Sequence, residues 1–289
     1  MNSSNLAKQA KPVMIFLSIG DQLTSISCGH VLVELVKFIA YQRQQIPYVY
    51  PWLKQIVNNR RDVLNEKEVT ESYQSERHFR IASSALENLD FILKSLLQEM
   101  NGSTLPDEIC IALGSTPVTC REVYRLVLPT ACHKPQCHSV LIASDQKIQK
   151  NIFKTLVTEE NLSQVFFSPL APTNMYIFIK KKLIGNHDYV VSDTFLHTSG
   201  CRIPRNSKIV VIDFRSANQE GLKCCNDFQI FGDADSKDLK FISPDADKED
   251  LYEIESNDTA TWYQSSYVMK GFKDCVVNGS SITNSWLTS

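Results

Sequence analysis

The chain lacks the features that mark several large classes of protein. It has no long apolar run, because the first eleven residues are polar and the run that follows, Val13 to Leu17, is too short for a signal peptide or a membrane span. Its 30 Lys and Arg residues are balanced by 32 Asp and Glu residues, so the excess of positive charge typical of a dedicated nucleic-acid binder is missing. We therefore expect no membrane or nucleic-acid partner, and a protein of the cytosol or nucleus.

The sequence is also poor in the motifs of common enzyme classes. It has 10 glycines in 289 residues and no Gly-rich phosphate loop of either standard type. None of its six histidines lies in a zincin pattern or beside a nucleophile elbow. We expect a protein that is not an enzyme and needs no cofactor. An enzyme whose catalytic groups come from distant segments stays open as the alternative.

The cysteines do not form a framework that suggests disulfides or a metal. There are nine of them, and an odd count in a protein without a secretion signal predicts reduced thiols. The segment Cys132-His133-Lys-Pro-Gln-Cys137-His138 holds four possible zinc ligands. Their spacing differs from the usual C-x2-C pattern, so we prefer a proline-containing loop, with zinc as the alternative, and expect no metal site.

Apolar patterning predicts a mixed α/β (α+β) fold. Runs of strand-forming residues indicate strands at 11–17, 108–113, 174–179 and 208–214. Helical spacing indicates helices at 27–45, 50–57, 76–100 and 144–157, and residues 58–74 are expected to form a loop. Thr119 and Glu122 have the spacing of a capping box, which predicts a short helix through Leu126. Lys180, Lys181 and Lys182 are expected to form a solvated strand end.

The last third of the chain changes character. Between Asp233 and Asp258 ten acidic residues face three lysines, which predicts a solvated acidic loop at 233–258. The aromatic segment from Thr261 to Lys273 then returns to strand character. Because this strand follows a long polar tract, it must pair with a strand that is distant in sequence.

One helix ends in an unusual group of polar residues. In ELVKFIAYQRQQIP, from Glu34 to Pro47, the apolar face of Leu35 and Phe38 continues into Gln42 and Gln45, with Arg43 beside them. Glutamine and arginine offer several hydrogen bonds, which suits the partly buried centre of a protein interface. A helix end that is merely solvated is the alternative. Gln42 is the first candidate for partner contact and Arg43 the second.

A second candidate lies on the helix that follows Ser144. Phe153 projects from the flank of this helix, about 100° from the buried row, and is surrounded by Gln149, Lys150 and Val157. An aromatic ring among long polar side chains is a plausible interface anchor. The alternative is a wide core stripe that includes it. The buried row consists of Ile148, Ile152 and Leu156.

Two blocks that lie far apart in the sequence are distinctive: ELVKFIAYQRQQIP, from Glu34 to Pro47, and WYQSSYVMKGFKD, from Trp262 to Asp274. Together they resemble the comet family of Mad2-binding spindle-checkpoint silencers, within the HORMA-fold superfamily. Weaker correspondence joins them, at the strand ending at Gly114, at 121–124 and at 151–154. The chain differs in a shorter N-terminal tail, a longer acidic tract and an extra tail at 275–289.

The resemblance implies a single HORMA-like domain at 12–274, with an antiparallel sheet backed by three main helices. It implies a C-terminal safety belt at about 185–274 and flexible ends at 1–11 and 275–289. The belt would close over the chain's own last strand, which mimics a partner peptide. The residues of this self-closing strand would be Trp262, Tyr263, Tyr267, Met269 and Phe272.

The function implied by the resemblance is that of an adaptor. Such a protein binds the closed conformer of the checkpoint protein Mad2 and presents it to an AAA+ remodelling ATPase, which silences the checkpoint and allows mitotic exit. We expect it to be monomeric alone, in nucleus and cytoplasm, and at the spindle or kinetochore in mitosis. A HORMA protein that captures a foreign peptide is the alternative. The partner-binding residues would be Gln42, Arg43, Gln149, Lys150, Phe153, Lys154 and Val157.

Overall fold

The computed structural model describes most of the chain outside its N-terminus and its acidic region. The described residues are 11–17, 24–66, 72–102, 104–129, 145–182, 193–201, 203–214 and 260–288. The Cys132–His138 cluster, the acidic loop predicted at 233–258 and most of the N-terminal segment 1–11 lie outside these ranges. The predictions for those segments are therefore not tested here.

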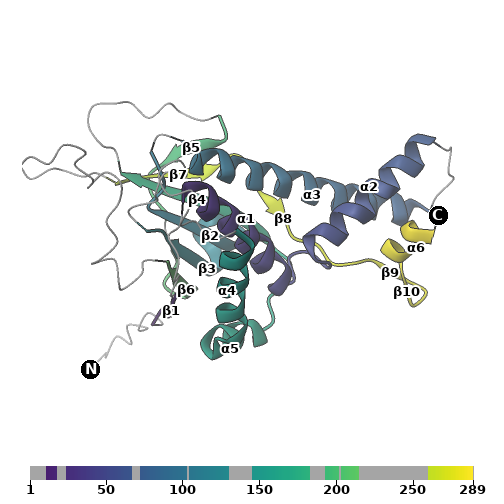
Figure 1. Ribbon diagram of the computed structural model, residues 1–289. Coiled ribbons are helices and arrows are strands. Elements are labelled where there is room, and N and C mark those ends of the chain that lie inside the picture. The colour runs from purple at the N-terminus through teal and green to yellow at the C-terminus, as the bar shows by residue number, and fades with distance from the viewer. Residues whose placement is uncertain are drawn as a thin grey trace, which may run out of the picture.

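Six helices and ten strands make up the described part (Figure 1). The helices are α1 (Ser25–Gln42), α2 (Tyr50–Glu66), α3 (Tyr73–Met100), α4 (Asp145–Thr158), α5 (Glu160–Phe167) and α6 (Ile282–Thr288), with a 3-10 turn η1 (Pro117–Thr119). The strands are β1 (Val13–Phe16), β2 (Glu108–Gly114), β3 (Cys120–Val127), β4 (Asn174–Lys182), β5 (Phe195–Thr198), β6 (Lys208–Asp213), β7 (Ala260–Ser265), β8 (Met269–Lys270), β9 (Val276–Val277) and β10 (Ser280–Ser281). The mixed α/β class predicted from the sequence is confirmed.

Eight of the strands form one sheet in the order β1-β6-β3-β2-β4-β7-β5, with β8 also paired to β4. The prediction of an antiparallel sheet is wrong for one part of it. Strand β6 runs parallel to both β1 and β3, whereas β2, β3, β4, β5 and β7 pair antiparallel. The parallel pairs arise because the chain leaves β3, passes through α4, α5, β4 and β5, and returns beside β3 as β6.

The two faces of the sheet differ in what packs on them. Helices α1, α3 and α4 lie over one face (Figure 1), and their apolar side chains share a core with alternate residues of the strands. Thr24 caps α1, with its Oγ1 accepting a hydrogen bond from the Ser27 backbone nitrogen at 3.1 Å. The opposite face carries a second, smaller apolar cluster. Its members include Cys110, Tyr176 and Phe178 from the strands and Cys201, Ile203 and Trp262 packed on them.

The segment around Thr119 is a strand and not the short helix predicted from its capping-box spacing. Thr116 and Thr119 do form a reciprocal cap, but it closes the single turn η1, and β3 begins at Cys120. Gly114 at the end of β2 lies so close to this turn that an added Cβ would meet the Cys120 Cα at 2.3 Å. Strands β2 and β3 are close in sequence, so they can pair as an antiparallel hairpin. This pairing overrides the local capping signal.

The tail predicted to be flexible at 275–289 is ordered over 275–288. It forms the hairpin β9–β10 and the helix α6, which lie beside α2 at the end of the molecule away from the sheet (Figure 1). Trp286 of α6 is buried. Helix α2 also continues to Glu66, into the region predicted to be a loop.

Among the described residues, none of the helices is long and apolar enough to cross a membrane.

Candidate partner-binding surface

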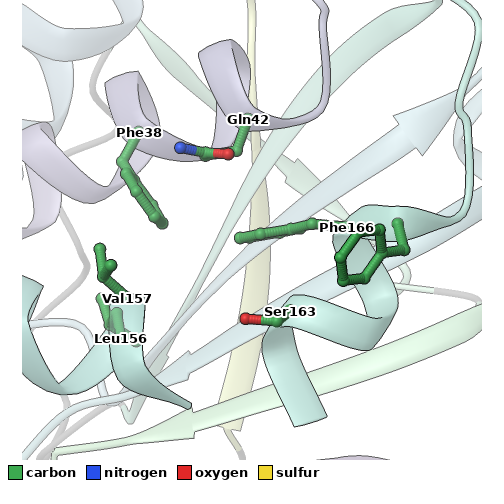
Figure 2. A pocket seen from close by; sticks show the side chains of 7 residues that line it. Phe38, Gln42, Leu156, Val157, Ser163 and Phe166 are labelled. Carbon is green, nitrogen blue, oxygen red and sulfur yellow. The ribbon is translucent and has the colours of Figure 1, made fainter. Parts of the chain in front are cut away.

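A shallow pocket of about 300 Å³ opens where the end of α1 meets α4 and α5. We call it the α1–α4–α5 pocket. Figure 2 shows Phe38 and Gln42 of α1 on one side and side chains of α4 and α5 on the other. Its lining consists of Phe38, Gln42, Leu156, Val157, Ser163, Phe166 and Phe167.

Two of the rings that line this pocket, Phe38 and Phe166, belong to an aromatic group that also includes Phe153. The Phe38 ring meets the Phe153 ring edge to face at a centroid distance of 5.4 Å, and the Phe166 ring at 5.9 Å. All three rings are half-buried, so they join α1 to α4 and α5 while leaving an edge toward solvent. Phe153 thus packs against the core, as the core-stripe interpretation expects, and its role as an interface anchor stays a prediction.

The rim of the pocket exposes apolar side chains that a folded protein usually covers. Val157 is 64% exposed and Phe167 is 86% exposed. Gln42, which also lines the pocket, is exposed. Lys154 and Lys150 are exposed on α4, about one and two turns before Val157, and Gln149 is half-buried. The structure therefore brings the predicted α4 residues and Gln42 to one side of the molecule.

The α5 contribution was missed by the sequence analysis. Phe166 and Phe167 are two adjacent phenylalanines followed by Ser168 and Pro169, and in a helix two neighbouring residues cannot both face the core. That pattern was an available signal for an exposed aromatic. Phe167 is the residue that it would have found.

Arg43 is not available to a partner, contrary to the prediction. Its side chain is 2% exposed, and its Nε and Nη2 each donate to one carboxylate oxygen of Glu122 at 2.7 Å. Nη1 and Nη2 also donate to the backbone oxygens of Phe166 and Ser168 at 3.1 and 2.8 Å. The guanidinium therefore ties the end of α1 to β3 and to the end of α5, which fixes the geometry of the pocket.

The carboxylate of Glu122 is held from a second direction. The Tyr124 hydroxyl donates to Glu122 Oε2 at 2.9 Å. Burial raises the pKa of Tyr124 far above its ordinary value, and the nearby Glu122 charge acts in the same direction. The phenol therefore stays a donor, and the buried ion pair is surrounded by hydrogen bonds.

The other two glutamines at the end of α1, Gln44 and Gln45, lie in a turn and in the core, respectively. Gln44 has a φ of 53° and ends the helix. Gln45 is fully buried: its Nε2 donates to the Arg43 backbone oxygen at 2.7 Å, and its Oε1 accepts from the Thr173 backbone nitrogen at 2.7 Å. The Phe272 backbone nitrogen donates to the Gln45 backbone oxygen at 3.0 Å. Gln45 thus joins α1 to the start of β4 and to the C-terminal segment.

Gln42 remains as the exposed polar residue between two hollows. A second, more polar pocket lies on its other side, formed by the turn after α1 and by the segment after β8. Gln42 is exposed and lines both pockets, so it lies within reach of a partner that covers either one. The second pocket is lined by Tyr41, Gln42, Gln44, Ile46, Pro47, Phe272, Lys273 and Asp274.

The sequence matches the profile of the p31comet family, described as "Mad1 and Cdc20-bound-Mad2 binding", over residues 3–195. The chain belongs to this family. The matched range includes every residue that lines the α1–α4–α5 pocket and ends before β7. A comparison with curated proteins finds no match.

The aromatic C-terminal segment of this p31comet-family chain is paired within the sheet. Strand β7 lies between β4 and β5, with Tyr263 opposite Ile179 of β4 and His197 of β5. Tyr263, Met269 and Phe272 are buried, whereas Trp262 is half-buried on the second face. These residues therefore form part of the core, and their role as a self-closing strand stays a prediction.

Tyr267 lies between β7 and β8 and is half-buried. Its ring stacks on Phe91 of α3 at a centroid distance of 4.6 Å, with 11° between the planes. This contact joins the returning chain to the helix layer.

Within the described ranges no group of three or more His, Cys, Asp or Glu side chains could hold a metal ion.

Proposed function

We propose that this p31comet-family protein is a non-enzymatic adaptor that binds the closed conformer of Mad2 through the α1–α4–α5 pocket and its rim. In this proposal it presents closed Mad2 to an AAA+ remodelling ATPase, so that the checkpoint is silenced and the cell leaves mitosis. It would act in nucleus and cytoplasm, and at the spindle or kinetochore in mitosis. Membership of a family described by Mad2 binding supports it.

The observation that carries the choice of surface is the exposure of Val157 and Phe167 at one rim. Covering a fully exposed Phe contributes about 2–3 kcal/mol, and such anchors usually dominate an interface. Gln42 adds an amide whose neighbours leave it free to face a partner, and Lys150 and Lys154 add positive charge at the edge. An apolar centre with a polar edge is the usual composition of a protein interface.

We further propose that the domain is HORMA-like and self-closed, with β7 in the place of a captured peptide. The pairing of β7 with β4 on one side and β5 on the other supports this. A peptide-capturing HORMA protein, the alternative from the sequence, would have to displace β7 and lose both pairings. The self-closed state is therefore the better reading.

The binding test uses the full chain and Mad2 locked in its closed form by a bound peptide. We expect Phe167→Asp and Val157→Asp each to weaken binding at least about 30-fold in calorimetry, which corresponds to a loss of about 2 kcal/mol. Gln42→Ala should weaken it by a smaller factor. Val276→Asp is the matched control, since Val276 is 62% exposed, lies on β9 away from the pocket, and should bind as the wild type does.

Unchanged affinity in both aspartate variants, with cooperative unfolding retained, would contradict the choice of surface. Wild-type protein that fails to bind closed Mad2 at all would contradict the function. The ATPase step is tested by following the conversion of closed to open Mad2 by the remodelling ATPase. Omission of the chain, or Phe167→Asp, should slow it.

A further inference from the structure

Two cysteines meet on the sheet face opposite the helices. The sulfur atoms of Cys110 and Cys201 lie 3.3 Å apart, although 91 residues separate them in sequence. Cys110 is in the middle of β2 and fully buried, whereas Cys201 follows β5 and is half-buried. Both are free thiols. The bond length of a disulfide is about 2.0 Å, so each sulfur needs to move by well under 1 Å to form one.

We propose that Cys110 and Cys201 form a reversible disulfide when the protein meets a peroxide, and that this bond fastens the segment after β5 to the centre of the sheet. Cys201 is the attacking sulfur because part of it faces solvent. Cys110 is the resolving sulfur because it is buried against the first. The proposal does not depend on Mad2 binding.

The electrostatic surroundings agree with these two roles. The hydrogen bond with Cys110 lowers the pKa of Cys201, and the Arg125 guanidinium acts in the same direction, although burial and the Glu108 carboxylate oppose this shift. The same hydrogen bond, together with burial, raises the pKa of Cys110. Arg125 itself is fixed by Glu108, whose Oε2 accepts from its Nη2 at 2.9 Å. A lowered pKa favours the nucleophilic thiolate at the more accessible of the two sulfurs.

The reaction proceeds in two steps that balance. The Cys201 thiolate attacks one oxygen of hydrogen peroxide, so that an S–O bond forms, the O–O bond breaks and hydroxide leaves. Cys110 then attacks the sulfur of this sulfenic acid, the S–S bond forms, the S–O bond breaks, and the thiol proton leaves with the oxygen as water. The two thiols lose two electrons, and the peroxide gains them.

The position of the bond gives it a consequence for the fold. Cys201 and Ile203 lie in sequence between β5 and β6 and pack on the second apolar cluster. Strand β5 is last in the order of the sheet and is held there by its pairing with β7. A disulfide from Cys201 to Cys110 would attach the segment that follows β5 to β2, near the middle of the sheet. Strand β5 could then no longer separate freely from β7. The oxidised protein should therefore resist opening at this edge.

The test uses the full chain, exchanged out of reductant and treated while folded with hydrogen peroxide. Remaining thiols are then blocked, and the digest is analysed without reduction by mass spectrometry. We expect a peptide pair linked through Cys110 and Cys201 that disappears on reduction. We also expect the Tm of the oxidised protein to rise by about 5–10 °C, because the link restricts the unfolded chain.

Cys201→Ser should abolish both the linked peptide and the rise in Tm. Cys275→Ser is the matched control, since Cys275 is also a half-buried free thiol, and it should retain both. Cys110→Ala is a second variant, which removes the other thiol of the pair and should also abolish the linked peptide. The proposal is overturned if peroxide leaves both thiols open to alkylation, drives Cys201 to the sulfinic acid, or links Cys201 to a different cysteine.

Discussion

At the scale of single residues, buried charges are where the structure departs most from what the sequence indicates. Arg43 stands among glutamines at a helix end and Lys181 stands in a run of three lysines, yet both are about 2% exposed. Each is paired with a carboxylate that is distant in sequence: Arg43 with Glu122, and Lys181 with Glu99 at 2.5 Å. The expectation of a solvated lysine cluster is wrong for Lys181. A charge can be buried only with such a partner, and local patterns do not reveal the partner.

The Arg43 pair makes a prediction about stability. Arg43→Ala leaves the buried carboxylate of Glu122 without its cation, so we expect the free energy of unfolding to fall by about 3–5 kcal/mol. Arg61→Ala, which breaks the exposed pair with Glu87, should cost less than about 1 kcal/mol. Urea unfolding of the two variants measures the difference. Equal losses would show that the Arg43 pair does not hold α1 in place.

At the scale of elements, the C-terminal hairpin and α6 form a unit with the start of α3. The Trp286 Nε1 donates to the Ser75 Oγ at 3.0 Å, and the Trp286 ring packs on His78 and Phe79 of α3. Asn278 and Gly279, both with positive φ, make the two-residue turn between β9 and β10. Asn-Gly is a strong hairpin signal in a sequence. It identifies the hairpin where the sequence analysis expected a flexible tail.

This unit should respond to pH through His78. Burial lowers the pKa of His78 below its ordinary 6.5, although the carboxylate of Asp274, 3.4 Å away, opposes the shift. The folded protein therefore prefers the neutral imidazole. The resulting stability is complete above pH 6.5 and is lost as the pH falls below that value, because the unfolded chain takes up the proton first.

We expect Tm to fall between pH 7.5 and 5.5, and His78→Gln to reduce that fall. His197→Gln, at an exposed position on β5, is the matched control and should keep the wild-type slope. Asp274 acts in a different range: burial would raise its pKa, but hydrogen bonds from Ser281, Thr283 and Tyr48 outweigh this and lower it. The contribution of Asp274 to stability is therefore present above pH 3.8 and is lost only as the pH falls below that value. An identical slope in His78→Gln and the wild type would contradict the assignment.

At the scale of the whole molecule, the end of the chain completes a sheet whose other strands come from its first three quarters. Strand β7 separates β4 from β5, so its removal leaves two strand edges unpaired and opens the core beside Tyr263. The segment after β8 then returns to α1, where Phe272 meets Gln45. Assembly of the candidate surface is therefore coupled to the last part of the chain.

Truncation tests this coupling. A chain that stops at residue 259 should lose cooperative thermal unfolding, because β4 and β5 lose their partner strand. A chain that stops at residue 274 keeps β7 and should unfold cooperatively, with a lower Tm because Trp286 is missing. Adding a synthetic peptide of residues 260–274 to the shorter chain should restore cooperative unfolding in calorimetry. If the shorter chain unfolds like the wild type, β7 does not close the domain.

Among the candidate site residues, exposure could be predicted from the sequence where it depends only on the helix that carries the residue. Lys150 and Val157 were placed beside Phe153 by helical spacing, because a helix fixes which side chains share a face, whereas Lys154 was named through the family resemblance. Arg43 was predicted to face a partner and is buried, because its position depends on the distant Glu122; Phe167 was overlooked, although its neighbour Phe166 made the pair an available signal. Whether these residues bind a partner stays a proposal.

The sequence by itself determined the positions of α1, α3 and α4, of β2, β4 and β6, and the membership of the p31comet family, because periodic apolar residues and family motifs are local signals. Only the tertiary structure decided the parallel pairing of β6, the burial of Arg43 and Lys181, the packing of Trp286 on α3 and the meeting of Cys110 with Cys201. Each of these depends on a partner that lies tens of residues away. The free energy of such a contact belongs to the pair, and neither half of the pair carries a signal of it alone.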